Sequence, residues 1–148
     1  MRILAFADNH GEERTFKIIE QKIKNSKPEI IVCCGDLTLF GKNLEEILER
    51  FDKKNIPFII VPGNHEDREL LMKSCSKKKN IIYLHKGIFE LKNRVFIGCE
   101  VNGFSEKDSE FRNFAKKIGS ELKKTEKKRK KSSLNISRQL KGPTSFSN

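Results

Sequence analysis

The stretch "IIVPGNHED", Ile59 to Asp67, decides the fold prediction, because an apolar run leads directly into polar groups. The run has the length and the β-branched content of a buried strand. It ends at a glycine, an amide, an imidazole and two acids. A strand that only builds a core normally ends at a bland turn, whereas this strand ends at groups that can bind a metal ion or donate a proton.

Two earlier apolar runs end in the same manner. Ile3 to Ala7 leads into "DNH", Asp8 to His10, and Glu29 to Cys34 leads into "GD", Gly35-Asp36. Each of the three runs is followed by apolar residues at helical spacing, and Asn43 with Glu46 resembles a capping box at the start of the second helix. The apolar positions are Phe16, Ile19 and Ile23, then Leu44, Ile47, Leu48 and Phe51, then Leu70, Leu71 and Cys75.

This β-α-β-α-β order predicts an α/β fold. Strands that are apolar throughout are typical of a parallel sheet that is covered on both faces. Right-handed crossovers place the carboxyl ends of all three strands at one edge of the sheet, which is where such sheets bind ligands. We therefore expect "DNH", "GD" and "GNH" to converge in space.

The second half of the chain has a different character. "GIFELKNRVFIG" predicts a hairpin that turns near Lys92-Asn93. Beyond Leu122 the apolar periodicity fades, and we expect a domain over residues 1–122 and a basic, disordered or loosely helical tail over 123–148. From Lys116 to Asn148 eleven Lys or Arg residues stand against two Glu residues, and this accounts for most of the net charge of +11.

Charge and composition limit the function classes. The basic run "KKTEKKRKK", Lys123 to Lys131, lacks the interleaved aromatics that stack on bases, so a solvated tail is favoured and nucleic-acid binding is the alternative. No apolar run is long enough for a membrane span, and no P-loop motif occurs. The four cysteines show no CxxC spacing and are interpreted as small buried thiols in a cytoplasmic protein.

Five side chains at the strand ends carry the chemistry: Asp8, His10, Asp36, Asn64 and His65. Carboxylates, imidazole and an amide oxygen suit divalent ions such as Mn, Fe or Zn. A pair of such ions about 3.5–4 Å apart can activate water and hold a phosphate. The alternative for each residue is a strand-end loop position or a helix cap. Glu66 and Asp67 are interpreted as acids of a first helical turn.

The three motifs together resemble the D-x-H, G-D and G-N-H-(D/E) signature of calcineurin-like metallophosphoesterases, over roughly Met1 to Phe114. The resemblance implies a β-sandwich flanked by helices and hydrolysis of phosphomonoesters or phosphodiesters by a metal-bound hydroxide. It implies that Asp8 and His10 bind one divalent ion (Mn, Fe, Zn or Ni), that Asp36 bridges two ions and that Asn64 binds the second. His65 would be the catalytic residue beside the phosphate.

The chain departs from that family pattern in its C-terminal part. The later histidine and the G-H-x-H motif are absent, and the remaining His85 is expected to be a strand-end side chain. We therefore expect an incomplete C-terminal part of the sandwich, from truncation or frame disruption, with self-association through the exposed sheet. The alternative function is a catalytically impaired remnant, or a metal- or anion-binding module with a basic tail.

Overall fold

The computed structural model describes residues 1–99 and 109–139, with side chains as far as Lys124. Its central element is a sheet of four parallel strands in the order β1-β2-β3-β4. All three pairs of neighbouring strands are parallel, so all carboxyl ends lie at one edge, as predicted. The strands are β1 (Ile3–Phe6), β2 (Ile30–Cys33), β3 (Phe58–Ile60) and β4 (Ile81–Tyr83).

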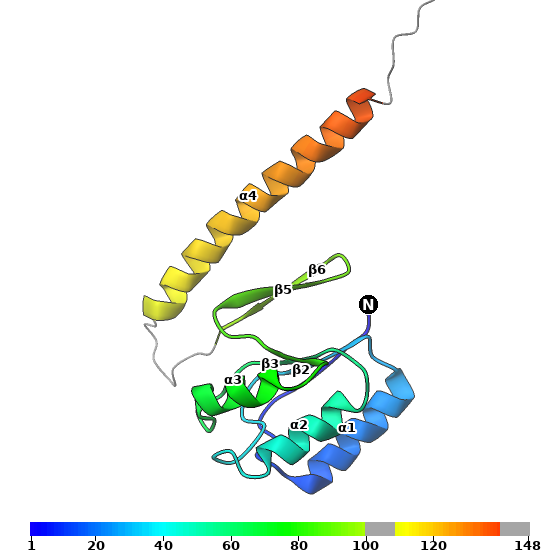
Figure 1. Cartoon of the computed structure of the whole chain (residues 1–148), viewed down its shortest axis with the longest axis vertical. Helices are drawn as coiled ribbons and strands as arrows, with labels where there is room; N and C mark the ends of the chain where they lie inside the picture. Colours follow the sequence, from blue (N-terminus) through cyan, green and yellow to red (C-terminus); the bar gives the residue numbers. More distant parts are fainter. Residues whose placement is uncertain (100–108, 140–148) are drawn as a thin grey trace, which may run out of the picture. The chain divides into compact units, whose positions relative to one another are not determined.

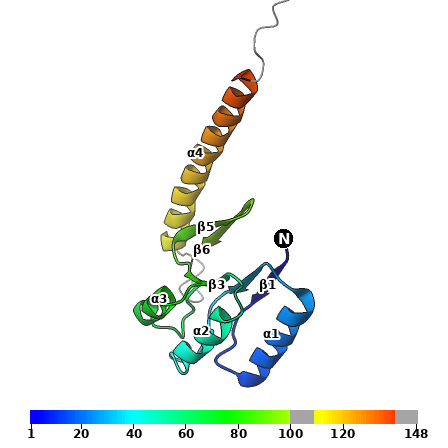
Figure 2. The ribbon, with the colours of Figure 1, turned by 45° about the vertical axis from the view of Figure 1, so that its right-hand side comes forward.

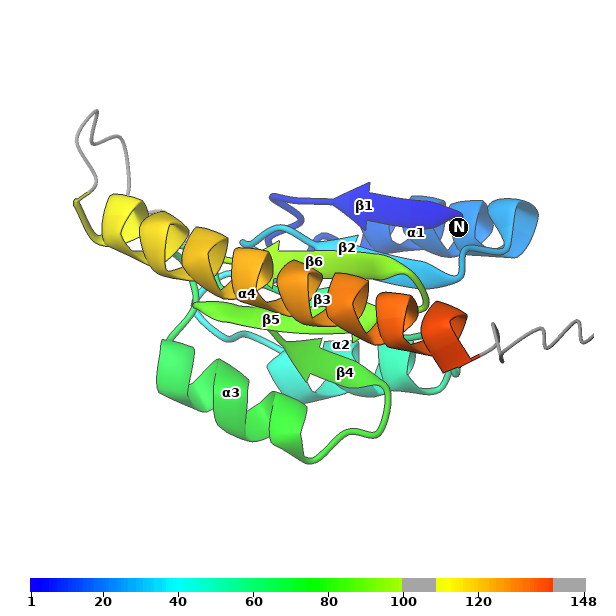
Figure 3. The ribbon, with the colours of Figure 1, turned by 90° about the horizontal axis from the view of Figure 1, so that it is seen from above.

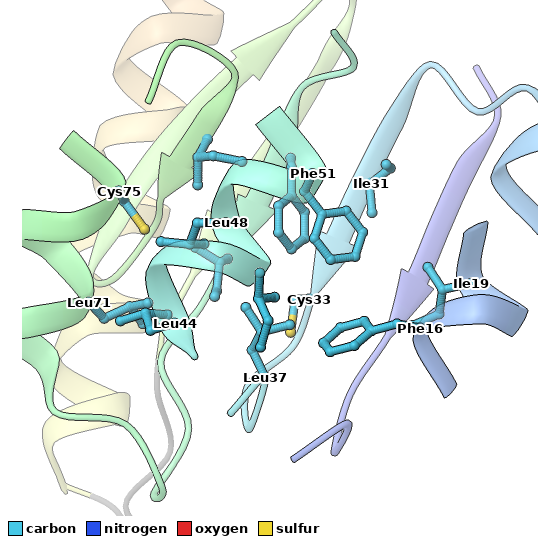
Figure 4. Close-up of a cluster of buried hydrophobic side chains, with 14 of the residues drawn as sticks. Phe16, Ile19, Ile31, Cys33, Leu37, Leu44, Leu48, Phe51, Leu71 and Cys75 are labelled. Atoms are coloured by element: carbon cyan, nitrogen blue, oxygen red, sulfur yellow. The ribbon is translucent and has the colours of Figure 1, made fainter. Parts of the chain in front are cut away.

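Three helices cover one face of this sheet (Figures 1 and 2). They are α1 (Glu13–Ser26), α2 (Leu44–Asp52) and α3 (Arg68–Ser76). Most of the apolar positions predicted from helical spacing are buried against the strands, as Figure 4 shows for several of them. Leu70 is the exception, because its side chain is 48% exposed.

The centre of this core is aromatic. The ring of Phe51 on α2 lies 4.5 Å from that of Phe58 on β3 and 6.0 Å from that of Phe16 on α1. These side chains join the helices to the sheet by removing large apolar surfaces from water. The core thus fixes the strands whose ends carry the polar segments.

The start of α2 differs from the prediction of a capping box. Asn43 has a left-handed backbone with φ 58°, and its side chain makes no capping hydrogen bond. An N-cap side chain accepts from the helix when its own backbone is extended, so the left-handed conformation turns the amide away from the first turn. The capping box at Asn43 and Glu46 is therefore wrong.

The other face of the sheet is covered by an antiparallel hairpin, β5 (Gly87–Leu91) and β6 (Arg94–Gly98) (Figure 3). The hairpin turns at residues 92 and 93, as predicted. Its apolar side chains pack against the sheet, and its Lys92 ammonium contacts the Glu29 carboxylate. The layers are therefore helices, parallel sheet and hairpin, which confirms the α/β class.

The chain has a second unit, separate from the one that contains the sheet. Its described part is the helix α4 (Ser109–Gln139), which runs through the predicted boundary between residues 122 and 123. The run after residue 122 is rich in Lys, Glu and Arg, which are good helix formers. The end of the predicted tail, 140–148, lies outside the described residues. Among the described helices none combines the length and apolar character needed to cross a membrane.

Candidate metal centre at the strand ends

Backbone hydrogen bonds join the segments that follow the first two strands. The N–H of Asp8 donates to the carbonyl of Gly35 at 3.2 Å, and the N–H of His10 donates to the carbonyl of Asp36 at 2.9 Å. The segment after β3 joins them, because the N–H of His65 donates to Asp36 Oδ1 at 3.0 Å. The three polar segments therefore meet, as the strand order predicted.

Three of the predicted side chains form one cluster. The nitrogen and oxygen atoms that His10, Asp36 and His65 offer to an ion all lie within 4.8 Å of one another. The two imidazole rings are 4.9 Å apart, centroid to centroid, at 86°. His10 is exposed, whereas the other two side chains are half-buried. One carboxylate and two imidazoles suit a first-row divalent cation.

The other candidate residues lie around this cluster rather than in it. Asp8 is exposed and is not among the clustered groups. Asn64 is exposed and lines a hollow of about 200 Å³ together with Asp36. His85 also lies outside the cluster, near the ring of Tyr83. The sequence prediction gave His65 a catalytic role and did not count it among the metal ligands. The structure places its imidazole beside His10 and Asp36.

The backbone of the site is strained. Asp8, His10 and Asp36 have left-handed φ angles of 54°, 52° and 52°. A non-glycine residue in this conformation costs free energy, of order 1–3 kcal/mol in sparsely populated regions, and such residues concentrate at functional sites. These three side chains are also three of the predicted ligands.

Glu66 is a site residue that the sequence prediction missed. Its carboxylate is buried and accepts backbone N–H groups of Asp36 at 3.0 Å, Thr38 at 2.8 Å and Gly63 at 2.9 Å. It thereby ties the loop after β2 to the turn after β3. Asp67 does lie at the start of a helix, as predicted, and it caps α3 by accepting a hydrogen bond from the N–H of Leu70. Nothing in the pattern "GNHED" distinguishes these two roles.

Buried polar atoms without a partner support the fit of a cation. The Nδ1 atom of His65 is buried and makes no hydrogen bond. The same holds for both amide atoms of Asn9, which stands between Asp8 and His10. Native proteins leave few buried polar atoms unsatisfied, so such atoms indicate a bound group or water. The donors of the cluster therefore suit a metal ion, and the orphaned nitrogen of His65 indicates a further bound group or water beside them.

Two thiols line the hollow beside Asp36 and Asn64. Cys34 is exposed and Cys99 is half-buried, and both line it. The prediction of four buried thiols is therefore wrong for this pair and right for Cys33 and Cys75. Successive side chains of an extended segment point to opposite faces of a sheet, so Cys33 packs in the core under the helices and Cys34 points away from that core.

Comparison with known proteins gives three similarities. The model of the family described as calcineurin-like phosphoesterase matches residues 1–139. The uncharacterized protein MJ1162 of Methanocaldococcus jannaschii is 28% identical over 101 residues, which are 66% of this chain and 42% of that protein. The chain thus spans less than half the length of this relative. A crystal structure aligns with a TM-score of 0.66 and 12% identity, over 80% of this chain and 64% of the other, which shows a shared fold.

Proposed function

The chain belongs to the calcineurin-like phosphoesterase family, and from this premise we propose that it is a metal-dependent hydrolase of phosphomonoesters or phosphodiesters. The observation that carries the proposal is the cluster of His10, Asp36 and His65, whose ligand atoms lie within 4.8 Å of one another. The cluster stands at the carboxyl ends of parallel strands, where open α/β sheets bind their ligands.

In this proposal His10 and Asp36 hold a divalent ion, and Asp8 and Asn64 supply further oxygen ligands. Mn, Fe, Zn and Ni all suit such a mixed set of donors, and a complete site would take two ions. A bound divalent ion supplies Lewis acidity, which withdraws charge from phosphoryl oxygens and makes water a stronger acid. The carboxylate of Asp36 is held for this task by the backbone N–H of His65 at 3.0 Å.

His65 is the proposed general acid. An imidazole beside the phosphate can donate a proton to the leaving alcohol oxygen or stabilise the charge that develops there. Support comes from the position of its ring, which lies 4.9 Å from that of His10 and 5.2 Å from that of Phe40. If His65 binds the ion instead, removal of its side chain would weaken metal binding as strongly as removal of His10 does.

A second candidate function is a metal- or anion-binding module that does not turn over substrate. The sequence has three histidines, and two of them lie in the described cluster. An ion that is held by few protein ligands is bound weakly, and a weakly bound ion catalyses poorly. Four cysteines without a disulfide among them fit a reducing compartment, so we place either function in the cytoplasm. The basic run could add nucleic-acid contacts.

The decisive experiment compares metal binding and turnover on the same samples. The purified chain is incubated with Mn²⁺, the bound metal is counted by mass spectrometry, and hydrolysis of bis(p-nitrophenyl) phosphate is followed. Asp36→Asn removes a ligand charge with little change in shape. Glu69→Gln is the matched control, because Glu69 is an exposed acid on α3. Circular dichroism checks that all three proteins are folded.

Turnover by the wild type and by Glu69→Gln, with loss in Asp36→Asn, supports the hydrolase. Metal binding without turnover in any sample supports the binding module and contradicts the hydrolase. Absence of bound metal in the folded wild-type chain contradicts the hydrolase and the metal-binding module, and leaves only a module that binds anions.

A further inference from the structure

An exposed aromatic side chain stands beside the candidate general acid. Phe40 is 78% exposed, and its ring lies 5.2 Å from that of His65 at an angle of 65°. The residue follows Asp36 by four positions and has a left-handed backbone with φ 51°. Exposing a large apolar side chain to water costs free energy, and so does a left-handed backbone. No core packing of Phe40 offsets these two costs.

The loop that carries Phe40 is fixed to the same carboxylate as the site. Thr38 donates its backbone N–H to Glu66 at 2.8 Å, and its hydroxyl oxygen accepts from the N–H of Gly41 at 3.1 Å. Glu66 directly follows His65 in the chain. The loop that carries Phe40 is therefore anchored, through Thr38, to the residue that follows His65, which makes the relative position of the two rings a built feature of the site.

Other exposed apolar side chains lie in or near the loop that carries Phe40. Its neighbour Leu39 is 45% exposed, and Leu70, which lies close to Gly41, is 48% exposed. An aromatic ring that keeps most of its surface open can stack on another planar group. Because His65 would stand at the leaving oxygen of the ester, the group nearest to Phe40 would be the alcohol part of the substrate.

We propose that Phe40 is a specificity-determining residue whose ring binds an aromatic group on the ester alcohol of the substrate. The preferred substrates are then aryl or nucleoside phosphoesters rather than alkyl phosphoesters. This inference rests on the proposed function, since it needs a phosphate bound beside His65. A purely structural role would be different: Phe40 would hold the imidazole in place and would affect every phosphate ligand equally.

The test measures binding of ligands that cannot be hydrolysed. Inorganic phosphate, methylphosphonate and phenylphosphonate are titrated by calorimetry into the full chain with Mn²⁺. Wild type should bind phenylphosphonate about three- to tenfold more tightly than methylphosphonate, the range that an aromatic pair contributes. Phe40→Ala should bind both phosphonates equally and phosphate as wild type does. Phe40→Tyr should keep the preference, and circular dichroism confirms folding.

Each other outcome overturns the proposal in a distinguishable manner. Equal affinity of wild type for the two phosphonates shows that no aromatic site exists. Equal weakening of all three ligands in Phe40→Ala shows that the ring only positions His65. If phosphate itself does not bind to the Mn²⁺-treated wild type, the proposed function fails, and the substrate preference fails with it.

Discussion

The backbone of Gly63 lies directly against the side chain of Asp36. A Cβ atom on Gly63 would be 2.2 Å from Asp36 Oδ1 and 2.4 Å from the Asp36 nitrogen. Gly35 makes a similar approach from the other side, because its added Cβ would be 3.1 Å from the Gly63 Cα. The glycines of the two motifs thus let the loops after β2 and β3 pack backbone to backbone, with the carboxylate between them.

Gly63→Ala should therefore displace the Asp36 carboxylate. We expect the affinity for Mn²⁺ to fall by about tenfold or more, the cost that is typical of disturbing the residues around a metal ligand. Calorimetric titration with Mn²⁺ measures the change. Gly119→Ala is the matched control, because an added Cβ on that glycine of α4 meets no atom within 4 Å. Unchanged Mn²⁺ affinity in a folded Gly63→Ala protein would show that Asp36 is not a ligand.

The hydrogen bonds of Glu66 make a second prediction, on stability. Glu66→Gln leaves one acceptor oxygen for the backbone N–H groups of Asp36, Thr38 and Gly63, and its NH₂ group meets donors. Leaving a buried donor without an acceptor costs about 1–3 kcal/mol, so we expect the free energy of unfolding to fall by about 2 kcal/mol. Urea denaturation gives the value.

Glu69→Gln again serves as the control for Glu66→Gln, because it removes an exposed carboxylate that lies three residues further along the chain. A loss for Glu66→Gln that equals the loss for Glu69→Gln would contradict the anchoring role of Glu66.

The order of the elements was predictable because it depends on patterns that lie along the chain. Apolar runs at Ile30 and Ile59 predict buried parallel strands, and parallel strands bring Asp36 and His65 to one edge whatever the details of the loops. The hairpin turn near Lys92 was readable for the same reason, since a polar break divides two apolar runs.

The parts that were missed depend on the exact path of the loops. Whether Glu66 starts a helix or accepts three N–H groups is decided by how closely Gly35 and Gly63 approach each other, which no spacing reveals. Likewise, Cys33 and Cys34 are chemically identical neighbours, and only the face of the sheet to which each side chain points separates them. Phe40 reads as one more apolar residue until its exposure is known.

A group of ion pairs on the helical layer should make the stability of the fold depend on pH. Glu20 on α1 receives hydrogen bonds from Arg50 on α2 at 2.7 and 3.1 Å. These bonds, together with the contact to Lys54, lower the pKa of the Glu20 carboxyl from 4.5 to about 2 against the opposing effect of burial. A carboxyl with a lowered pKa stabilises the fold above its unfolded pKa, and this contribution disappears as the pH falls from 4.5 to about 2.

Glu20→Gln should therefore be less stable than wild type by about 1 kcal/mol at pH 7, after allowance for solvent screening of the pair. The difference should shrink towards zero as the pH approaches 2. Urea denaturation of both proteins between pH 7 and pH 2 measures it. Glu46→Gln is the control, because Glu46 is an exposed acid on α2. A difference that is independent of pH would show that the Glu20 contribution is packing rather than charge.

The adjacent thiols Cys33 and Cys34 should differ sharply in reactivity. Burial raises the pKa of the Cys33 thiol and raises that of Cys75 to about 12, so neither forms the reactive thiolate at neutral pH. Cys34 is exposed and lines the hollow beside Asp36. In the native protein at pH 8, iodoacetamide should modify Cys34 about a hundredfold faster than Cys33, because Cys33 needs an opening of the fold to react.

Fragment mass spectrometry of the labelled peptide assigns the modified residue, and Cys34→Ser is the control that removes the fast site. Full unfolding in urea should make both thiols react at similar rates. Because Cys34 lines the same hollow as Asp36, Mn²⁺ with phosphate should slow its labelling and leave that of Cys33 unchanged. Equal native rates for the two thiols would mean that the Cys33 side chain is not buried where the structure places it. If Cys34 is labelled equally fast with and without Mn²⁺ and phosphate, the bound anion lies away from this hollow.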